Sequence, residues 1–175
     1  MILKGFKEKS NKKYINKSIK NRVVNADNTI IKTVGIVVNS KEFSDLEWIN
    51  SFVKDLRINQ NNLKILSLFN GKKEETSVYN NTFSEKDLGW KGQFKSQVAK
   101  DFIANSFDLL VNFYETESLA LQVISATTEA KFKVGIANAN QKINDLIIDT
   151  KIKDKAIFKT ELIKYLNILN KISNE

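Results

Sequence analysis

The chain has 175 residues, the size of one ordinary domain, with 42% hydrophobic residues, 27% charged residues and a net charge of +8. It has neither cysteine nor histidine, which excludes disulfides, zinc or iron–sulfur sites built on thiolate or imidazole, and catalysis by a histidine base. No apolar run approaches the roughly 18 residues of a membrane span, and the N-terminus lacks a secretory signal, so we expect a cytoplasmic protein.

The basic character is concentrated at the N-terminus. Residues 1–24 carry eight basic residues and one acidic residue, a net charge of +7, whereas the remainder carries 20 basic and 19 acidic residues, a net charge of +1. We predict a basic N-terminal helix or arm over residues 1–28 and a single domain over residues 29–175. The basic residues of the first segment are Lys4, Lys7, Lys9, Lys12, Lys13, Lys17, Lys20 and Arg22.

The first half of the domain predicts a strand, a helix and a second strand. Residues 33–38 form a nearly continuous β-branched run, typical of a strand that is buried on both faces. Ser44 and Glu47 fit a capping box, which predicts a helix that begins at Ser44. A second apolar run spans residues 63–69. The predicted apolar stripe of the helix consists of Leu46, Ile49, Val53 and Leu56, widened by Trp48 and Phe52.

Residues 71–93 carry weaker signals. Residues 77–79 are compatible with a short strand, and residues 83–92 read as an ordered loop. Trp90 stands in this loop between Gly89 and Gly92, and the lysines around it are Lys86, Lys91 and Lys95. Trp90 could be a stacking platform for a base, with phosphate contacts from the lysines, or an aromatic plug that orders the loop.

The second half continues the alternation of strands and amphipathic helices. The helix over residues 118–130 is apolar nearly all round, and the last helix has the clearest amphipathic pattern of the chain. We therefore predict an α/β fold with a doubly wound, mostly parallel five-stranded sheet in three layers, Rossmann-like or flavodoxin-like. The predicted strands here span 107–114, 132–137 and 146–148, and the helices 96–105, 118–130 and 155–172.

Several short phrases form an ordered set along the chain. They occupy residues 87–92 (DLGWKG), 107–110 (FDLL), 130–135 (AKFKVG), 145–148 (DLII) and 164–166 (KYL). With the lysine-rich start, this set resembles a family of uncharacterised cytosolic proteins of about this length from Bacteroidota (flavobacterial), a domain of unknown function. The resemblance implies a stand-alone protein and carries over no catalytic residue.

No P-loop, dinucleotide-binding glycine motif or EF-hand loop occurs, and no cofactor is expected. In open α/β sheets, ligands bind beyond the carboxyl ends of the strands. Glu115 and Glu117 are the best candidates there for acid–base or cation chemistry, although they could instead favour the dipole of the helix that follows. The candidate ligand-binding residues at these strand ends are Asn39, Ser40, Asn70, Glu115, Glu117 and Asn138.

The basic segment has three interpretations. A membrane-surface helix needs a continuous apolar face, which Lys13 and Lys17 interrupt. Spaced lysines suit phosphate contacts with RNA, and their predominance over arginine favours charge attraction over base-specific contacts. The segment could also be a helix laid across the domain with solvated lysines.

The sequence leaves three hypotheses for the function of this chain. The first is a non-catalytic binding protein whose basic segment contacts RNA or a ribonucleoprotein such as the ribosome. The second is a binder of a nucleotide or sugar, or an enzyme, that uses the carboxylates at the strand ends. The third is a structural domain that binds a protein partner.

Overall fold

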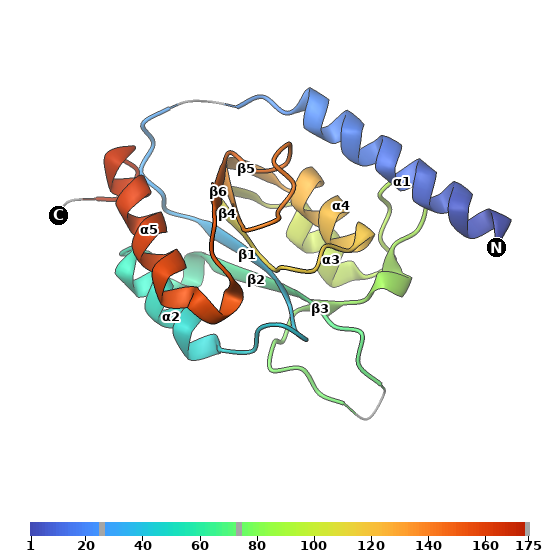
Figure 1. Ribbon diagram of the computed structural model, residues 1–175, viewed down its shortest axis with the longest axis horizontal. Helices are drawn as coiled ribbons and strands as arrows, with labels where there is room; N and C mark the ends of the chain where they lie inside the picture. Colours follow the sequence, from blue (N-terminus) through green and yellow to red (C-terminus); the bar gives the residue numbers. More distant parts are fainter. Residues whose placement is uncertain (25–26, 73–74, 174–175) are drawn as a thin grey trace.

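The structure, a computed structural model, describes residues 1–24, 27–72 and 75–173. In these residues six strands form one parallel sheet in the order β3-β2-β1-β4-β5-β6 (Figure 1). This order is that of a doubly wound sheet, and the predicted α/β class is confirmed. The strands are β1 (Val34–Asn39), β2 (Leu63–Leu68), β3 (Thr82–Phe83), β4 (Ser106–Phe113), β5 (Glu129–Ile136) and β6 (Leu146–Ile148).

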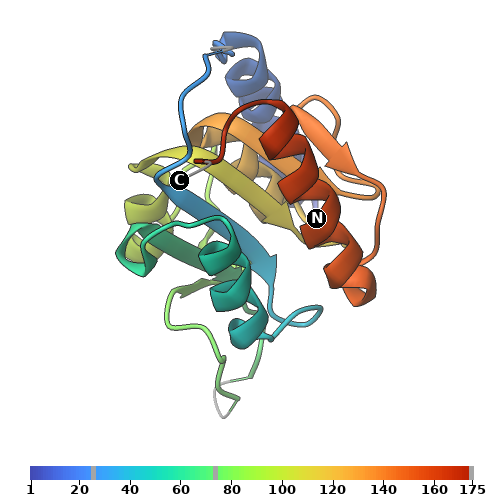
Figure 2. The same ribbon diagram turned by 90° about the vertical axis from the view of Figure 1, so that its left-hand side faces the viewer.

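Helices cover both faces of the sheet and make three layers. Helices α2 and α5 lie side by side on one face, and α3 and α4 lie on the other (Figures 1 and 2). Helix α1 packs against α4, outside the layer that α4 forms. The helices are α1 (Ile2–Asn21), α2 (Leu46–Asp55), α3 (Gln97–Ile103), α4 (Leu119–Thr127) and α5 (Lys155–Ile168), with 3-10 turns at Gln60–Asn62, Glu85–Asp87 and Ile152–Asp154.

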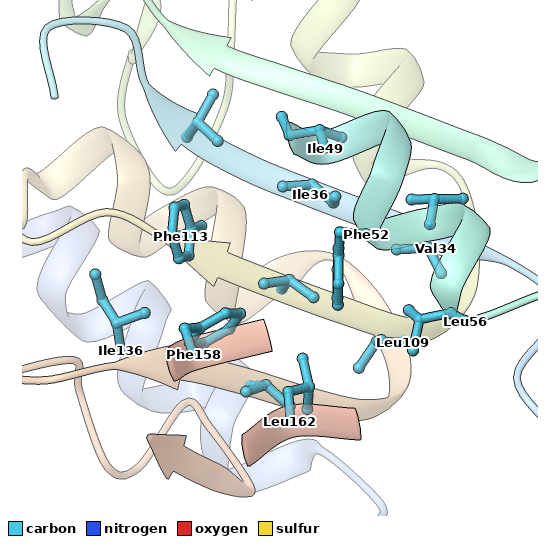
Figure 3. Packing of buried hydrophobic residues seen from close by; sticks show 14 of the residues in the cluster. Val34, Ile36, Ile49, Phe52, Leu56, Leu109, Phe113, Ile136, Phe158 and Leu162 are labelled. Atoms are coloured by element: carbon cyan, nitrogen blue, oxygen red, sulfur yellow. The ribbon is translucent and has the colours of Figure 1, made fainter. Parts of the chain in front are cut away.

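The alternation of side chains along β1 explains why its sequence has no polar residue from Val34 to Val38. Ile36 belongs to the apolar cluster under α2 and α5, together with Phe52 and Phe158, whereas Val37 belongs to the cluster on the opposite face. Figure 3 shows the first of these layers, with Phe113 of β4 beside Phe158 of α5. A strand buried on both faces needs no polar alternation.

The sixth strand, β3, was not predicted. Only two residues pair with β2, too few for a hydrophobic period to show. Residues 77–79, which the sequence left compatible with a short strand, form none. Tyr79 is buried, and its hydroxyl donates to the backbone carbonyl of Phe43 at 2.9 Å.

The predicted capping box at the start of α2 is also wrong. The helix begins at Leu46 and its N-cap is Asp45, whose carboxylate accepts a hydrogen bond from the backbone N–H of Trp48 at 2.9 Å. Asp45 also pairs with Lys155 at the start of α5. A carboxylate caps a helix as well as a hydroxyl does, and here it also links α2 to α5 through Lys155.

Candidate nucleic-acid interface

The predicted N-terminal helix is docked on the domain. Ile15 of α1 is only 3% exposed and belongs to the same apolar cluster as Leu121 of α4. Residues 25–26, within the predicted N-terminal segment 1–28, lie outside the described residues. Because one side of α1 packs against α4, the residues on the opposite side of the helix face solvent.

Asn11 fastens the helix to a turn in the loop before α3. Its side-chain amide donates to the carbonyl of Gly89 at 2.9 Å, and its side-chain oxygen accepts from the backbone N–H of Gly92 at 2.7 Å. Gly92 has a φ of 71°, and a Cβ placed there would come within 2.2 Å of the Tyr14 ring. The close approach of α1 to this turn therefore needs a glycine at position 92.

The docking side of α1 leaves lysines on the opposite side. Successive helical residues are rotated by about 100°, which places Lys9, Lys13 and Lys20 within about 40° of one another and opposite the buried pair Asn11 and Ile15. All three lysines are exposed. Lys17 lies one turn after Tyr14, and it too is exposed.

The other basic residues of this segment are placed differently. Lys4 is exposed near the start of α1, and Lys7 is half-buried. Lys12 is exposed but forms an ion pair with Glu8 at 2.6 Å, one helical turn away.

Arg22, predicted to contact nucleic acid, serves a different role. Its guanidinium makes a bidentate ion pair with Asp145, with distances of 2.8 and 2.6 Å, and also donates to the carbonyl of Ala130 at 3.3 Å. Both charged side chains are largely buried. We therefore exclude Arg22 from the interface, because its charge is already neutralised within the domain.

Trp90 is 46% exposed, which is incompatible with an aromatic plug. The turn that carries it is closed by backbone hydrogen bonds from Gly89 N–H to the carbonyl of Gln93 at 2.7 Å and from Gln93 N–H to that of Trp90 at 3.0 Å. Leu88 and Phe94, on either side, supply the buried anchors. The exposed lysines around the turn are Lys86, Lys91 and Lys95.

A pocket of about 650 Å³ lies between the end of α1, the end of α4 and the first residues of β4 and β5. It opens at the amino edge of the sheet, the edge opposite to the one that the sequence predicted for a ligand. Its lining includes Tyr14, Lys17, Arg22, Thr128, Lys131 and Lys133.

Lys133 is a buried base beside this pocket. It is 1% exposed, and its ammonium donates to the carbonyls of Ser125 at 2.7 Å and Ala126 at 3.3 Å in the last turn of α4. Burial and, to a smaller extent, the charge of Arg22 lower the pKa of Lys133 to about 7, while Asp145 acts in the opposite direction. Lysine near a helix C-terminus is favourable, but its desolvation works against the charged form.

The candidates at the carboxyl edge are engaged in holding loops together. Glu115 accepts from the backbone N–H of Ile152 at 2.6 Å, and Glu117 accepts from that of Asn140 at 2.9 Å. Three of the amide and hydroxyl candidates also make hydrogen bonds to the backbone of nearby loops and strands. Asn138 is distinguished by its backbone, which has a positive φ of 66°. Asn39 accepts from Lys41 N–H, Ser40 donates to the Leu68 carbonyl, and Asn70 accepts from Glu85 N–H.

Glu42 closes the point between β1 and β4 where doubly wound folds bind dinucleotides. Its two carboxylate oxygens accept from the backbone N–H groups of Glu115 and Thr116, both at 2.8 Å. With Asp45 at the start of α2, this carboxylate makes the region unfavourable for a phosphate group. Sequence reasoning missed both Glu42 and Asn11, and neither belongs to a recognisable motif.

Two further features concern metals and membranes. Across residues 1–24, 27–72 and 75–173, no group of three or more acidic side chains is placed to hold a metal ion. Over the same residues, no helix combines the length and apolar character needed to cross a membrane.

Comparison with known proteins gives one match. A model described as "Family of unknown function (DUF6913)" matches residues 7–169. The expected resemblance to an uncharacterised domain of this length is thereby confirmed. No curated protein and no solved structure matches the chain.

Proposed function

The chain belongs to the DUF6913 family, a family of unknown function. From the exposed residues of this chain, we propose that it is a non-catalytic protein that binds RNA through α1 and the Trp90 turn. We define the basic face as Lys9, Lys13, Lys17 and Lys20 of α1 together with Trp90 and Lys91. The proposal places this RNA contact in the cytoplasm, on RNA or on a ribonucleoprotein such as the ribosome.

The pair of hydrogen bonds made by Asn11 is the observation that carries this proposal. The basic helix and the Trp90 turn are separated by more than 60 residues of sequence, yet Asn11 bonds to both Gly89 and Gly92. The turn that carries the exposed Trp90 is thereby fixed to α1, the helix that also carries the exposed lysines. This combination of a stacking surface with a positive groove or row is the one that proteins use for single-stranded nucleic acid.

The charges determine the expected strength and its salt dependence. Lys9 and Lys13 are one turn apart, and Lys20 follows about 10 Å further along the helix. If about four lysines neutralise phosphates, the slope of log affinity against log salt is about −3 for single-stranded RNA. Lysines supply a point charge without the fork geometry of arginine, so we expect little preference among sequences.

The docking of α1 decides how the proposal must be tested. Removing residues 1–24 would take Ile15 out of the apolar cluster and Asn11 out of the Gly89–Gly92 turn, so a truncated chain would report on folding as well as binding. Substitution of exposed lysines avoids this problem, because their side chains make no part of the buried layer.

The experiment is a titration of single-stranded and duplex RNA at several salt concentrations. The variant replaces Lys9, Lys13 and Lys20 by Gln, and the matched control replaces Lys54, Lys100 and Lys151, exposed lysines on other parts of the molecule. We expect the variant to weaken binding and move the salt slope about 2 units toward zero, with the control close to the parent protein. Equal salt slopes for all three proteins, or no binding at low salt, would contradict the proposal.

Trp90 allows a second, independent test. Trp90→Ala should weaken the binding of single-stranded RNA about 5-fold to 150-fold, since stacking of one base contributes about 1–3 kcal/mol. Trp90→Phe retains a stacking ring and should recover most of the affinity. Duplex RNA, whose bases are not available for stacking, should be bound equally by all three proteins.

A further inference from the structure

Helix α5 presents an outward row of four residues at the spacing of a helix-pairing seam. Ile157, Glu161, Lys164 and Ile168 follow one another at intervals of four, three and four residues. Ile157, in the first turn of α5, is 55% exposed, and Ile168, its last residue, is 64% exposed, whereas isoleucine is usually buried. Two exposed apolar residues thus flank two charged ones.

The inner contacts of α5 confirm that this row faces away from the domain. Phe158, Leu162 and Leu166 are fully buried against the sheet. The flank toward α2 is occupied by the ion pairs of Lys155 with Asp45 and of Lys159 with Asp55. In Figure 2, α5 lies at the surface beside α2, with its outer side uncovered.

The order of the four residues is complementary to itself when the helix is reversed. In an antiparallel pair of α5 helices centred between residues 162 and 163, Ile157 faces Ile168 of the second copy, and Glu161 faces its Lys164. The two-fold axis then repeats each contact, as an interface between identical copies requires. In a parallel pair, Glu161 would face Glu161 and Lys164 would face Lys164, so the charges select the antiparallel arrangement.

We propose that the protein forms a two-fold symmetric homodimer through the outer row of α5, with the two helices antiparallel. The partner is a second copy of this chain because the same surface supplies both halves of each apolar and each charged contact. The Glu161–Lys164 ion pair, 3.2 Å long within one helix, becomes part of a four-charge cluster at the centre of the interface.

The small area of the outer row of α5 limits the affinity of the proposed dimer. A single helix of 14 residues buries less than the roughly 1,200–2,000 Å² of a stable complex. The dimer is therefore weak and reversible, and it forms as the protein concentration rises.

The proposed dimer is independent of the RNA contact. Helix α5 covers one face of the sheet, whereas α1 lies outside α4 on the other face (Figure 1). A dimer formed through α5 leaves the basic face of each copy accessible.

The test uses charge reversal and sedimentation over protein concentrations from about 1 μM to about 1 mM. The parent protein should shift from monomer toward dimer across this range. Glu161→Lys and Lys164→Glu should each remain monomeric, because like charges then meet across the axis. Lys100→Glu on α3, on the opposite face of the sheet, is the matched control and should dimerise like the parent protein.

Mixing the two reversed proteins separates an effect between chains from one within a chain. A Glu161→Lys chain opposite a Lys164→Glu chain restores an opposite charge at every contact, although the ion pair inside each helix stays broken. We expect the mixture to contain a heterodimer that neither protein forms alone. A parent protein that stays monomeric at every concentration, or a mixture that stays monomeric, overturns the proposal.

The isoleucines provide a second readout. Ile157→Ser and Ile168→Ser together should abolish dimer formation while the helix content measured by circular dichroism stays unchanged, because both side chains are exposed in the monomer. A dimer that persists in this variant would show that another surface forms it, and would overturn the assignment to α5.

Discussion

Arg22, one residue beyond the end of α1, makes a bidentate ion pair with Asp145, which lies 123 residues later, immediately before β6. Asp145 also accepts a hydrogen bond from the backbone N–H of Lys133 in β5 at 2.8 Å. One carboxylate thus joins the basic helix to two strands of the sheet. The basic face proposed to bind RNA depends on this attachment and on that of Asn11.

We expect Asp145→Asn to lower the free energy of unfolding by about 2–4 kcal/mol, because it leaves the largely buried guanidinium of Arg22 without an opposite charge. Replacing both residues, Arg22→Met with Asp145→Asn, should cost less than the sum of the two single changes. Urea unfolding of the four proteins of this double-mutant cycle measures the difference. Strictly additive effects would show that the ion pair does not stabilise the docked helix.

Asn11→Ala should destabilise the protein by about 1–3 kcal/mol, since it leaves the carbonyl of Gly89 and the N–H of Gly92 without their partner. Asn16→Ala is the matched control, an asparagine exposed on the same helix, and its effect should be small or slightly stabilising. Hydrogen exchange should show faster opening of α1 and of the Trp90 turn in Asn11→Ala alone. Equal stability of the two variants would contradict the fastening role of Asn11.

Two glycines of the same surface should respond to alanine with opposite signs. Gly5→Ala places a methyl group in open space within α1 and should stabilise the helix by about 0.5–1 kcal/mol. Gly92→Ala meets the Tyr14 ring at 2.2 Å and forces alanine to a φ of 71°, so it should destabilise by more than about 1 kcal/mol. Thermal or urea unfolding of both variants measures the contrast, and a neutral Gly92→Ala would mean that the turn can move away from α1.

The buried Lys133 makes stability depend on pH in the alkaline range. Its pKa is about 7 in the folded protein, below the ordinary lysine value of 10.5. Between these values the unfolded chain binds more protons than the folded one, so stability should rise with pH. Below pH 7 both states are protonated and the contribution no longer changes.

The variant Lys133→Met removes this titration. Unfolding measured between about pH 7 and pH 9.5 should give a stability difference, parent minus Lys133→Met, that rises with pH. The measurement ends below the pH at which tyrosines ionise. Burial raises the pKa of Tyr114 and of Tyr79 above that of free tyrosine. At higher pH these tyrosines ionise more readily in the unfolded chain, which lowers stability. A difference that stays constant over the window would show that Lys133 keeps an ordinary pKa in the folded protein.

The sequence alone determined the class of fold and the separation of charge. Continuous β-branched runs identify strands buried on both faces, and helical spacing of apolar residues identifies the covering layers, because both signals are local. The +7 charge of residues 1–24 is likewise a property of the chain itself.

Only the tertiary structure decided which of these residues face solvent and which hold the fold together. Arg22 turned inward to Asp145, Trp90 turned outward, and Glu42 closed the strand ends where a ligand was expected. Each of these outcomes depends on a partner more than 20 residues away, or on burial by such partners. A hydrogen bond or ion pair across that distance leaves no period or spacing in the sequence, so only the folded chain reveals it.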